Sequence, residues 1–337
     1  MTEPARPVEL ETLPMPRAGD GRALLEVVSC GLCHTDVSFL YGGVRPRKPL
    51  PLTLGHEILG VVLEADRRTD LVGRRVVVPA VLPCGECELC RAGRGNICRR
   101  QKMPGNDFDG GFASHVLVPE RYLVPVPAAL AENSAIAVVA DAVSTAYQAV
   151  ERADVDPSRM VVVVGAGGVG TFAIQCARRR GATVVAIDIS PERLEDVAAW
   201  TAGGLDASEL TRRDIRSAVE EHERDAGLAP HGRVVLECSG SAAGQETAFG
   251  LLTYDGTLMV VGYTREKIPL RLSNLMAFDA RAVGNWGCLP EHYPRLLDLV
   301  ASGDLELEPF VEEQPMSRLN ELMVRHDGRR PVLTPDF

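Results

Sequence analysis

A glycine-rich turn directly after an apolar run restricts the fold more than any other feature of this sequence. The run Met160–Val164 predicts a buried strand, and Gly165–Gly170 (Gly-Ala-Gly-Gly-Val-Gly) follows at once. Gly165 permits a tight turn, Gly167 lets a pyrophosphate approach the backbone, and Gly170 lets a helix pack closely on the strand. The order strand, turn, helix predicts a dinucleotide site with the phosphates at a helix N-terminus. The residues expected to hold the cofactor there are Gly165, Gly167, Gly168, Val169 and Gly170.

A carboxylate in the right place strengthens this interpretation over that of an ordinary glycine turn. Asp188 ends the next expected strand, eighteen residues after Gly170, where a carboxylate would bind the ribose hydroxyls. A carboxylate there repels a 2′-phosphate, so the sequence favours NAD over NADP. Arg193 lies close enough along the chain to leave NADP open as the alternative.

Strand-like and helix-like segments alternate through the second half of the chain, and Pro191 suits the first position of a helix. The expected strands are Met160–Val164, Thr183–Ile187, Arg233–Cys238 and Thr257–Gly262, and the expected helices are Gly168–Arg180 and Pro191–Trp200. This alternation is typical of an α/β fold with a doubly wound parallel sheet.

The first 130 residues have a different texture, rich in Gly and Pro. Short β-branched runs such as Val61–Leu63 and Arg75–Val78 are interrupted by turn residues, which predicts an irregular, largely β domain. The Ala-rich segment Ala131–Val150 has helical spacing and is expected to bridge two domains. A further helix at Glu291–Val300 precedes a tail that we expect to return to the first domain.

Four of the nine cysteines crowd into fifteen residues, in the pattern Cys84-x2-Cys87-x2-Cys90-x7-Cys98. Four thiolates close a tetrahedron around zinc and leave no position for a substrate, so this spacing predicts a structural zinc site. The alternative, four free thiols on one loop, is chemically unattractive.

A second set of metal-ligating residue types is dispersed along the chain: Cys33, His56, Glu57 and Asp141. Cys33, His56 and Asp141 would supply a thiolate, an imidazole and a carboxylate, the three protein ligands of a catalytic zinc that keeps one position open. Glu57 would be a fourth, exchangeable ligand or a base beside the metal. Each of the three ligands has a structural alternative when it is considered alone: Cys33 as a buried thiol, His56 as a core histidine and Asp141 as a helix-capping aspartate.

The order of Cys33, Gly55-His56-Glu57, a four-cysteine lobe, a third ligand and then the glycine turn resembles the zinc-dependent medium-chain dehydrogenase/reductase family. The resemblance covers nearly the whole chain. It implies a GroES-like, β-rich catalytic domain over residues 1–132 and 290–337 with its zinc lobe at 84–98, and a Rossmann NAD-binding domain over 133–289. It also implies two zinc ions per chain, an active site between the domains, and a homodimer or homotetramer formed through the Rossmann domains.

The resemblance further implies an alcohol dehydrogenase, in which zinc lowers the pKa of the substrate alcohol and NAD accepts a hydride. Thr35 matches the hydroxyl that takes the alcohol proton, whereas Ser38 stands where a histidine often continues that relay. Thr145 would lie beside the nicotinamide and His34 would contact the pyrophosphate. Asp141 departs from the commonest pattern, a cysteine, and makes the metal the stronger Lewis acid.

Several stretches resemble one branch of the family, the 6-hydroxycyclohex-1-ene-1-carbonyl-CoA dehydrogenases: Tyr41–Arg45, Met103–Asp107, Gly110–His115, Leu272–Phe278 and Gly284–Pro290. That branch oxidises a cyclic allylic secondary alcohol, carried as a CoA thioester, to the 6-oxo product. An anionic CoA ester needs a local basic surface. The candidates are Arg45, Arg47 and Lys48, or Arg265, Lys267 and Arg271, and both groups are otherwise solvated loop residues. Trp286 would roof the ring pocket or serve as a core or interface aromatic.

Three other functions stay open at this point. The substrate would be another alicyclic or allylic alcohol without CoA. Zinc-assisted hydration of the enone, a lyase activity with Glu57 as base, would stand beside the oxidation. A non-enzymatic nucleotide-binding regulator would have lost the ligands Cys33, His56 and Asp141, which are all present.

The formal net charge is −10, from 36 basic and 46 acidic residues, which argues against a general nucleic-acid binder. No apolar run approaches the 18 or so residues of a membrane span, and no secretion signal is recognisable. With 45% hydrophobic and 24% charged residues, the sequence is expected to form a soluble cytoplasmic protein with a small-molecule substrate and neither nucleic-acid nor membrane partners.

Overall fold

The computed structural model describes residues 1–325 and 328–337 of the chain, which form two compact units. The first, termed the β-rich unit, comprises Met1–Ser144 and Gly287–Phe337, and the second, the parallel-sheet unit, comprises Thr145–Trp286. The units therefore divide after Ser144 and after Trp286, whereas the domain bounds given by the resemblance, at 132 and 290, stay a prediction.

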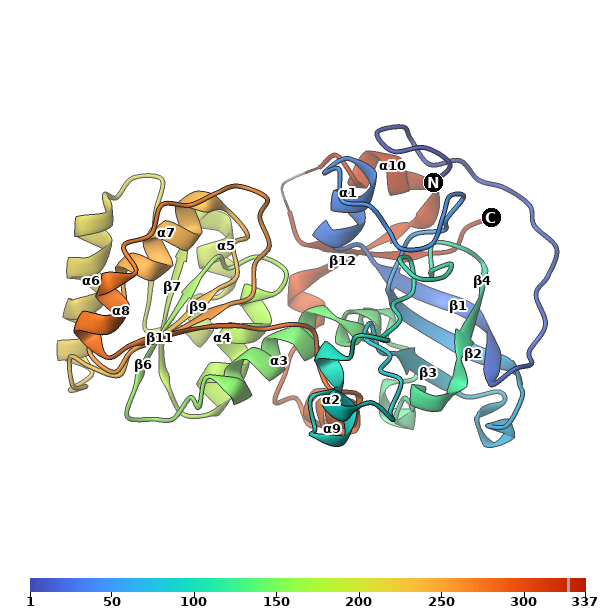
Figure 1. The fold of residues 1–337 in the computed structure, drawn as a ribbon, viewed down its shortest axis with the longest axis horizontal. Coiled ribbons are helices and arrows are strands. Elements are labelled where there is room, and N and C mark those ends of the chain that lie inside the picture. Colours follow the sequence, from blue (N-terminus) through green and yellow to red (C-terminus); the bar gives the residue numbers. More distant parts are fainter. Residues whose placement is uncertain (326–327) are drawn as a thin grey trace. The chain divides into compact units, whose positions relative to one another are not determined.

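The β-rich unit is built on a seven-stranded sheet in the order β12-β13-β1-β2-β3-β5, with β4 paired to β1 (Figure 1). Its strands are β1 (Arg22–Gly31), β2 (Glu57–Ala65), β3 (Arg75–Val78), β4 (His115–Pro119), β5 (Val124–Pro125), β12 (Val311–Pro315) and β13 (Arg330–Thr334). Neighbouring strands are antiparallel except β12 and β13. The pairing of Gly31 with Glu57 sets the end of β1 beside the start of β2, so Cys33 and His56 come together just beyond the sheet.

The helices of this unit are short: α1 (His34–Leu40), α2 (Glu88–Arg91), α9 (Tyr293–Ala301) and α10 (Leu319–Leu322). Single 3₁₀ turns lie at Thr69–Leu71, Gly95–Ile97, Glu120–Tyr122, Ala128–Leu130, Pro290–His292, Glu308–Phe310 and Met316–Arg318. A longer 3₁₀ helix, η5 (Ser134–Ala140), precedes α3 (Ala142–Arg152), which crosses into the second unit.

One helical segment is broken in the structure. The segment Ala131–Val150 has helical spacing in the sequence, but η5 ends at Ala140 and α3 begins at Ala142. Asp141 between them has φ −141° and ψ −60°, outside the helical region. The flanking backbone groups bond elsewhere, since the Ala140 carbonyl accepts from Ala80 N and Ala142 N donates to the Glu57 carboxylate. Tertiary hydrogen bonds thus replace two bonds that a continuous helix would make.

The parallel-sheet unit has six strands in the order β11-β10-β9-β6-β7-β8, all parallel. Its strands are β6 (Met160–Val164), β7 (Thr183–Asp188), β8 (Gly203–Asp206), β9 (Val234–Glu237), β10 (Thr257–Val260) and β11 (Arg281–Gly284). Helices α4 (Gly170–Arg179), α5 (Pro191–Asp196), α6 (Arg212–Asp225), α7 (Ala242–Gly250) and α8 (Ser273–Phe278) flank the sheet, with a 3₁₀ turn at Ala198–Trp200 (Figure 1). The strand order reverses between β6 and β9, which is where doubly wound sheets bind ligands, and the expected fold class is confirmed.

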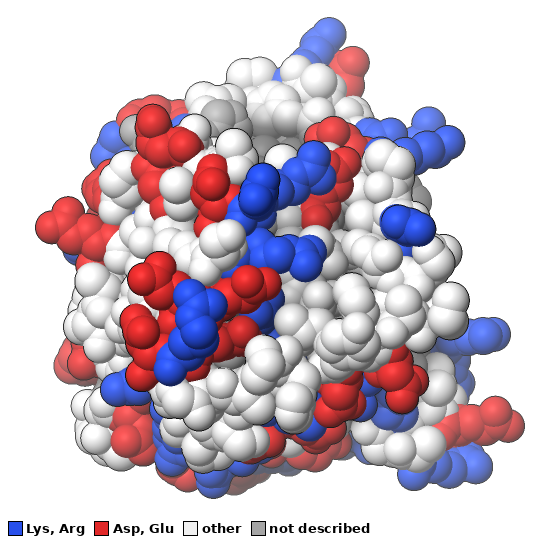
Figure 2. All heavy atoms as spheres, turned by 90° about the vertical axis from the view of Figure 1, so that its left-hand side faces the viewer, with Lys and Arg blue, Asp and Glu red and all other residues white. Residues whose placement is uncertain are grey.

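The surface carries both signs of charge. On the face shown in Figure 2, Lys and Arg side chains lie among Asp and Glu, without a broad basic area of the kind that binds nucleic acid. Within residues 1–325 and 328–337, no helix is both long and apolar enough to cross a membrane.

Candidate metal and cofactor sites

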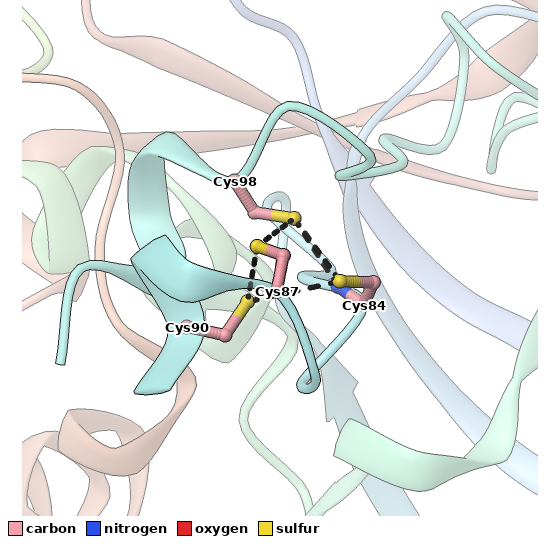
Figure 3. A group of neighbouring side chains, drawn as sticks. All are labelled: Cys84, Cys87, Cys90 and Cys98. Atoms are coloured by element: carbon pink, nitrogen blue, oxygen red, sulfur yellow. Dashed lines mark hydrogen bonds between the residues drawn. The ribbon is translucent and has the colours of Figure 1, made fainter. Parts of the chain in front are cut away.

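The four clustered cysteines turn their sulfurs toward one another (Figure 3). Cys87 caps α2, Cys90 lies within it, and Cys98 ends the 3₁₀ turn Gly95–Ile97. The Sγ–Sγ distances are 3.5 Å for Cys84–Cys98 and Cys87–Cys90, 3.6 Å for Cys87–Cys98 and 3.9 Å for Cys84–Cys90. A tetrahedron of Zn–S bonds has edges of about 3.8 Å, so the predicted structural zinc site has the right dimensions.

The backbone around this lobe also favours thiolates. Peptide N–H groups of Glu86 and Cys87 lower the pKa of Cys84 to about 6, while burial and the Cys87 thiol raise the pKa of Cys90 to about 12. Cys98 Sγ accepts from the N–H groups of Cys84 and Arg100 at 3.5 and 3.3 Å. Four thiolates this close together would repel one another, and a soft divalent ion would supply the compensating charge.

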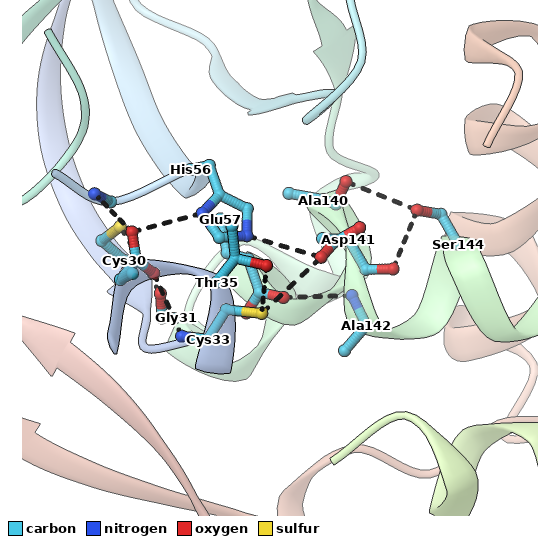
Figure 4. Close-up of polar contacts among 12 residues, drawn as sticks. Cys30, Gly31, Cys33, Thr35, His56, Glu57, Ala140, Asp141, Ala142 and Ser144 are labelled. Atoms are coloured by element: carbon cyan, nitrogen blue, oxygen red, sulfur yellow. Dashed lines mark hydrogen bonds and ion pairs between the residues drawn. The ribbon is translucent and has the colours of Figure 1, made fainter. Parts of the chain in front are cut away.

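The dispersed set also comes together: ligand atoms of Cys33, His56, Glu57 and Asp141 all lie within 4.8 Å of one another (Figure 4). Asp141 Oδ2 is 3.9 Å from Cys33 Sγ and 3.4 Å from His56 Nε2. Ligand pairs on a tetrahedral zinc are separated by about 3.6 Å for S and O and about 3.3 Å for N and O. His56 Nε2 is buried and makes no hydrogen bond with the described residues. A metal ion would satisfy this nitrogen, so the three residues fit a catalytic zinc.

A buried carboxylate that the sequence analysis missed, Asp36, holds two of these ligands in place. It accepts from Cys33 N at 3.2 Å and Gly55 N at 3.0 Å, and one of its oxygens lies 3.3 Å from His56 Nδ1. Burial lowers the pKa of His56, but Asp36, Asp141 and Cys33 outweigh burial, so the pKa lies well above its ordinary value. The surroundings of His56 therefore favour positive charge. The signal available in the sequence was a carboxylate three residues after Cys33, at the third position of a capping box.

Glu57 is already bound within the protein. Its carboxylate accepts from Arg330 Nη2 at 2.6 Å, Arg330 Nε at 3.0 Å and Ala142 N at 3.1 Å. Burial raises the pKa of Glu57 and the Arg330 guanidinium opposes that rise. A side chain on Gly31 would place its Cβ 2.0 Å from Glu57 Oε2, so a glycine is required beside this ion pair. Arg330, from β13, is a second residue missed by the sequence analysis, in which nothing marked it.

The two residues after Cys33 lie on α1, at the edge of the cluster. Thr35 Oγ1 is 3.6 Å from Cys33 Sγ, and the residue is half-buried. His34 is exposed. The structure thus brings Thr35 to the metal ligands and leaves His34 accessible to a ligand.

The glycine turn has the form expected for a dinucleotide site. Gly165 has φ +94°, and a Cβ there would lie 2.6 Å from Ser239 N, so only glycine fits. A Cβ on Gly170 would lie 1.7 Å from the Gly165 carbonyl oxygen. A Cβ on Gly167 would meet only Arg193 Nη1, at 3.8 Å, which leaves room for a ligand against the backbone. The turn leads into α4, whose N-terminus suits a phosphate.

Asp188, which is expected to bind the ribose hydroxyls, also makes hydrogen bonds to the neighbouring backbone. Its Oδ2 accepts from Ala166 N at 2.7 Å and its Oδ1 accepts from Ser190 N at 3.0 Å. Arg193 Nη1 lies 3.9 Å from Oδ1. The carboxylate therefore ties the glycine turn to the end of β7, and both oxygens keep a lone pair for a ribose hydroxyl.

Comparison with known proteins agrees with this geometry. Residues 19–128 match the alcohol dehydrogenase GroES-like domain and residues 168–302 match the zinc-binding dehydrogenase family. An NAD-dependent alcohol dehydrogenase of Sulfurisphaera tokodaii is 32% identical over 308 residues, covering 85% of this chain and 84% of the relative. The chain belongs to the zinc-type medium-chain alcohol dehydrogenase family. It is an oxidoreductase acting on CH–OH groups, and the non-enzymatic alternative is set aside.

Two further relatives extend the comparison. An alcohol dehydrogenase of Geobacillus stearothermophilus is 29% identical over 323 residues, covering 95% of this chain and 93% of that protein. The crystal structure of a zinc-binding dehydrogenase from Sinorhizobium meliloti bound to NADP has a TM-score of 0.85 at 26% identity, covering 96% of this chain and 94% of that one. The β-rich and parallel-sheet units are thus a GroES-like domain and a Rossmann domain, and the cofactors of the family are zinc and NAD(P).

Proposed function

We propose that this enzyme is a zinc- and NAD-dependent dehydrogenase of a secondary alcohol, with Cys33, His56 and Asp141 as the ligands of the catalytic zinc. The observation that carries the proposal is the buried Nε2 of His56, which has no hydrogen-bond partner among the described residues and lies beside the Cys33 thiol and the Asp141 carboxylate. When bound, zinc supplies Lewis acidity toward the alcohol oxygen, and NAD accepts the hydride.

The side chains around the zinc ligands have distinct parts in this proposal. The Thr35 hydroxyl lies 3.6 Å from Cys33 Sγ, which supports the proposal that it accepts the proton that the alcohol releases. Asp36 fixes the orientation of the His56 ring through Nδ1, so that Nε2 faces Asp141. Thr145 and His34 are proposed to contact the nicotinamide and the pyrophosphate, as in the family that this chain resembles.

NAD is proposed in preference to NADP because of the charge at Asp188. The Asp188 carboxylate would repel the 2′-phosphate of NADP. The neighbouring cation, Arg193, lies 3.9 Å from Asp188 Oδ1, so the carboxylate already neutralises part of the charge that would attract the phosphate. The kcat/KM for NAD should exceed that for NADP. The Asp188→Asn variant should have a smaller ratio of kcat/KM for NAD to kcat/KM for NADP than the unaltered enzyme. A higher kcat/KM for NADP in the unaltered enzyme would overturn the preference.

We propose a ring alcohol as the substrate. The contacts of the basic residues Arg47 and Lys48 favour a ring alcohol that is not attached to CoA. Arg47 Nη1 lies 3.4 Å from Asp107, and Lys48 Nζ lies 2.7 Å from Asp109 and 2.8 Å from the Pro51 carbonyl. Because a carboxylate accompanies each of these cations, the positive field that an anionic CoA would need is weakened. We therefore place an alicyclic or allylic alcohol first and the CoA thioester second.

The hydrogen-bond partners of Glu57 make hydration of the enone, with Glu57 as the base, a less favoured function. The Glu57 carboxylate is fully buried and is engaged by Arg330 and Ala142 N, so it is not set up to take a proton from water. Water addition to the enone that is lost in Glu57→Gln would support the lyase function.

The Rossmann unit carries an uncovered edge that suits a second copy. The edge strand β11 is largely exposed, and Tyr254, Leu272 and Met276 are exposed apolar residues of the same unit. We propose a homo-oligomer formed through this edge. Sedimentation of the enzyme at the mass of a single chain would contradict it.

The deciding experiment follows NADH absorbance with NAD and 6-hydroxycyclohex-1-ene-1-carboxylate, in parallel with its CoA thioester. Cys33→Ser, which is expected to lose the catalytic zinc alone, provides the control. Turnover of the free ring alcohol supports the substrate without CoA, and turnover of the thioester alone supports the CoA ester instead. Two zinc ions per chain with turnover of neither compound would retain the dehydrogenase and reject the ring alcohol.

A further inference from the structure

The third zinc ligand, Asp141, lies in the break between η5 and α3 rather than within a regular element. The peptide groups on its two sides therefore determine where its carboxylate points. On the C-terminal side, Ala142 N donates to Glu57 Oε1 at 3.1 Å, which fixes that peptide to the ligand cluster. The N-terminal side needs an anchor of its own.

That anchor is a tyrosine from a remote segment. The hydroxyl of Tyr293, at the start of α9, donates to the Ala140 carbonyl at 2.6 Å, and Ala80 N donates to the same oxygen at 3.1 Å. Tyr293 is only 1% exposed, so water does not compete for this bond. The orientation of the peptide that enters Asp141 is thus set by a side chain 153 residues beyond Ala140.

Ser144 completes the arrangement from the first turn of α3. Its Oγ lies 3.2 Å from the Asp141 carbonyl oxygen (Figure 4). The same hydroxyl lies 3.1 Å from Tyr293 Oη, and Ser144 is fully buried. A buried network in which every hydroxyl has a partner holds the backbone more rigidly than packing alone.

We propose that Tyr293, supported by Ser144, is a positioning residue for the catalytic zinc, holding the Ala140–Asp141 peptide so that the Asp141 carboxylate faces Cys33 and His56. Tyr293 is proposed to touch neither metal nor substrate. This inference rests on the proposed zinc ligands. Groups that orient metal ligands typically change metal affinity about 10- to 100-fold when removed.

The test compares Tyr293→Phe, which keeps the ring and removes only the hydroxyl, with Ser29→Ala. Ser29 is a matched control because its buried hydroxyl donates to the Ser134 carbonyl at 2.8 Å, at the opposite end of η5. Chelator competition gives the zinc dissociation constants, and the ligand-field absorption of the cobalt-substituted enzyme reports the geometry of the catalytic site.

Tyr293→Phe should raise the dissociation constant of the catalytic zinc about tenfold and shift the cobalt absorption, with the four-cysteine zinc unchanged. Ser29→Ala should lower thermal stability without altering either metal readout. A dissociation constant and a cobalt spectrum equal to those of the unaltered enzyme in Tyr293→Phe would overturn the inference. Should that variant not fold, Ser144→Ala replaces it, with a smaller rise expected and an unchanged constant again decisive.

The same titration separates the two proposals. If the unaltered enzyme binds only one zinc per chain, the proposed catalytic ligands are wrong, and Tyr293 loses its proposed purpose with them. If the unaltered enzyme binds two zinc ions, and Tyr293→Phe and Ser144→Ala have the same zinc dissociation constants and cobalt spectra as the unaltered enzyme, the zinc assignment stands. Only the role of Tyr293 is then rejected.

Discussion

The two metal-binding clusters of this enzyme are built in opposite ways. The four cysteines lie between residues 84 and 98, on one lobe whose backbone N–H groups already favour thiolates. The proposed catalytic set joins Cys33, His56 and Asp141, and the residues proposed to hold it include Arg330 and Tyr293, far along the sequence from Cys33. A local cluster depends on its own loop, whereas a dispersed cluster depends on the correct folding of the whole GroES-like unit.

Removing a ligand of the dispersed cluster should have the largest effect on turnover. Cys33→Ser is expected to lose one of two zinc ions and to lower kcat at least about 10³-fold, since Lewis-acid stabilisation is worth several kcal/mol. Cys30→Ala is the control, because Cys30 is a buried thiol three residues away and outside the ligand group. Metal analysis and NADH formation measure both variants. Equal activity in the two would show that Cys33 is not a ligand.

Next in size is the loss of the cation behind Glu57. Arg330→Met leaves the fully buried Glu57 carboxylate without its partner, which should cost about 3–5 kcal/mol of unfolding free energy. Arg318→Met, which breaks an exposed pair with Glu321, should leave the unfolding free energy nearly unchanged. Urea denaturation measures both. Similar losses in the two variants would mean that the Glu57–Arg330 pair is not a buried support of the site.

The local cluster should respond in stability more than in chemistry. Cys87→Ser is expected to release the structural zinc and to lower the unfolding free energy by about 3 kcal/mol, with kcat per folded molecule nearly unchanged. Thermal unfolding and active-site titration separate the two quantities. If instead turnover vanished while stability was kept, the assignment of the two sites would be reversed.

The smallest of these effects concerns a group that orients ligands without binding metal. Asp36→Asn keeps an acceptor for only one of Cys33 N and Gly55 N, because an amide nitrogen replaces one carboxylate oxygen, and it removes the negative charge beside His56 Nδ1. Zinc affinity at the catalytic site should fall about tenfold, or about 1.4 kcal/mol. Asp70→Asn, at an exposed pair with Arg68, should leave it unaltered. If Asp36→Asn left the dissociation constant of the catalytic zinc unchanged, the role of Asp36 would be confined to capping helix α1.

The sequence predicted those elements whose pattern is local. Strands Met160–Val164 and Arg75–Val78 have the expected bounds, because a short apolar run between turn residues has few alternatives. The expected helix Pro191–Trp200 ends early, at Asp196, and a separate 3₁₀ turn follows. The helical spacing of Ala131–Val150 does not yield one continuous helix, since the bonds that break it come from Ala80 and Glu57.

The same distinction applies to the sites. Both ligand sets and the glycine turn carry residue types that are rare outside such chemistry, and the structure brings each set together. Asp36, Arg330 and Tyr293 were missed because a carboxylate, a guanidinium and a phenol occur everywhere in proteins. Their roles follow from partners 20, 273 and 153 residues away, which only the folded chain reveals.

The position of β13 inside the sheet, between β12 and β1, has a consequence for synthesis on the ribosome. Until residue 330 has left the exit tunnel, the strand that carries the arginine partner of Glu57 is missing, and the end of β1 lacks its neighbour. The cysteine lobe is complete more than 200 residues earlier. A nascent chain is therefore expected to complete its four-cysteine site earlier in translation than the proposed catalytic zinc site, which has to wait for residue 330.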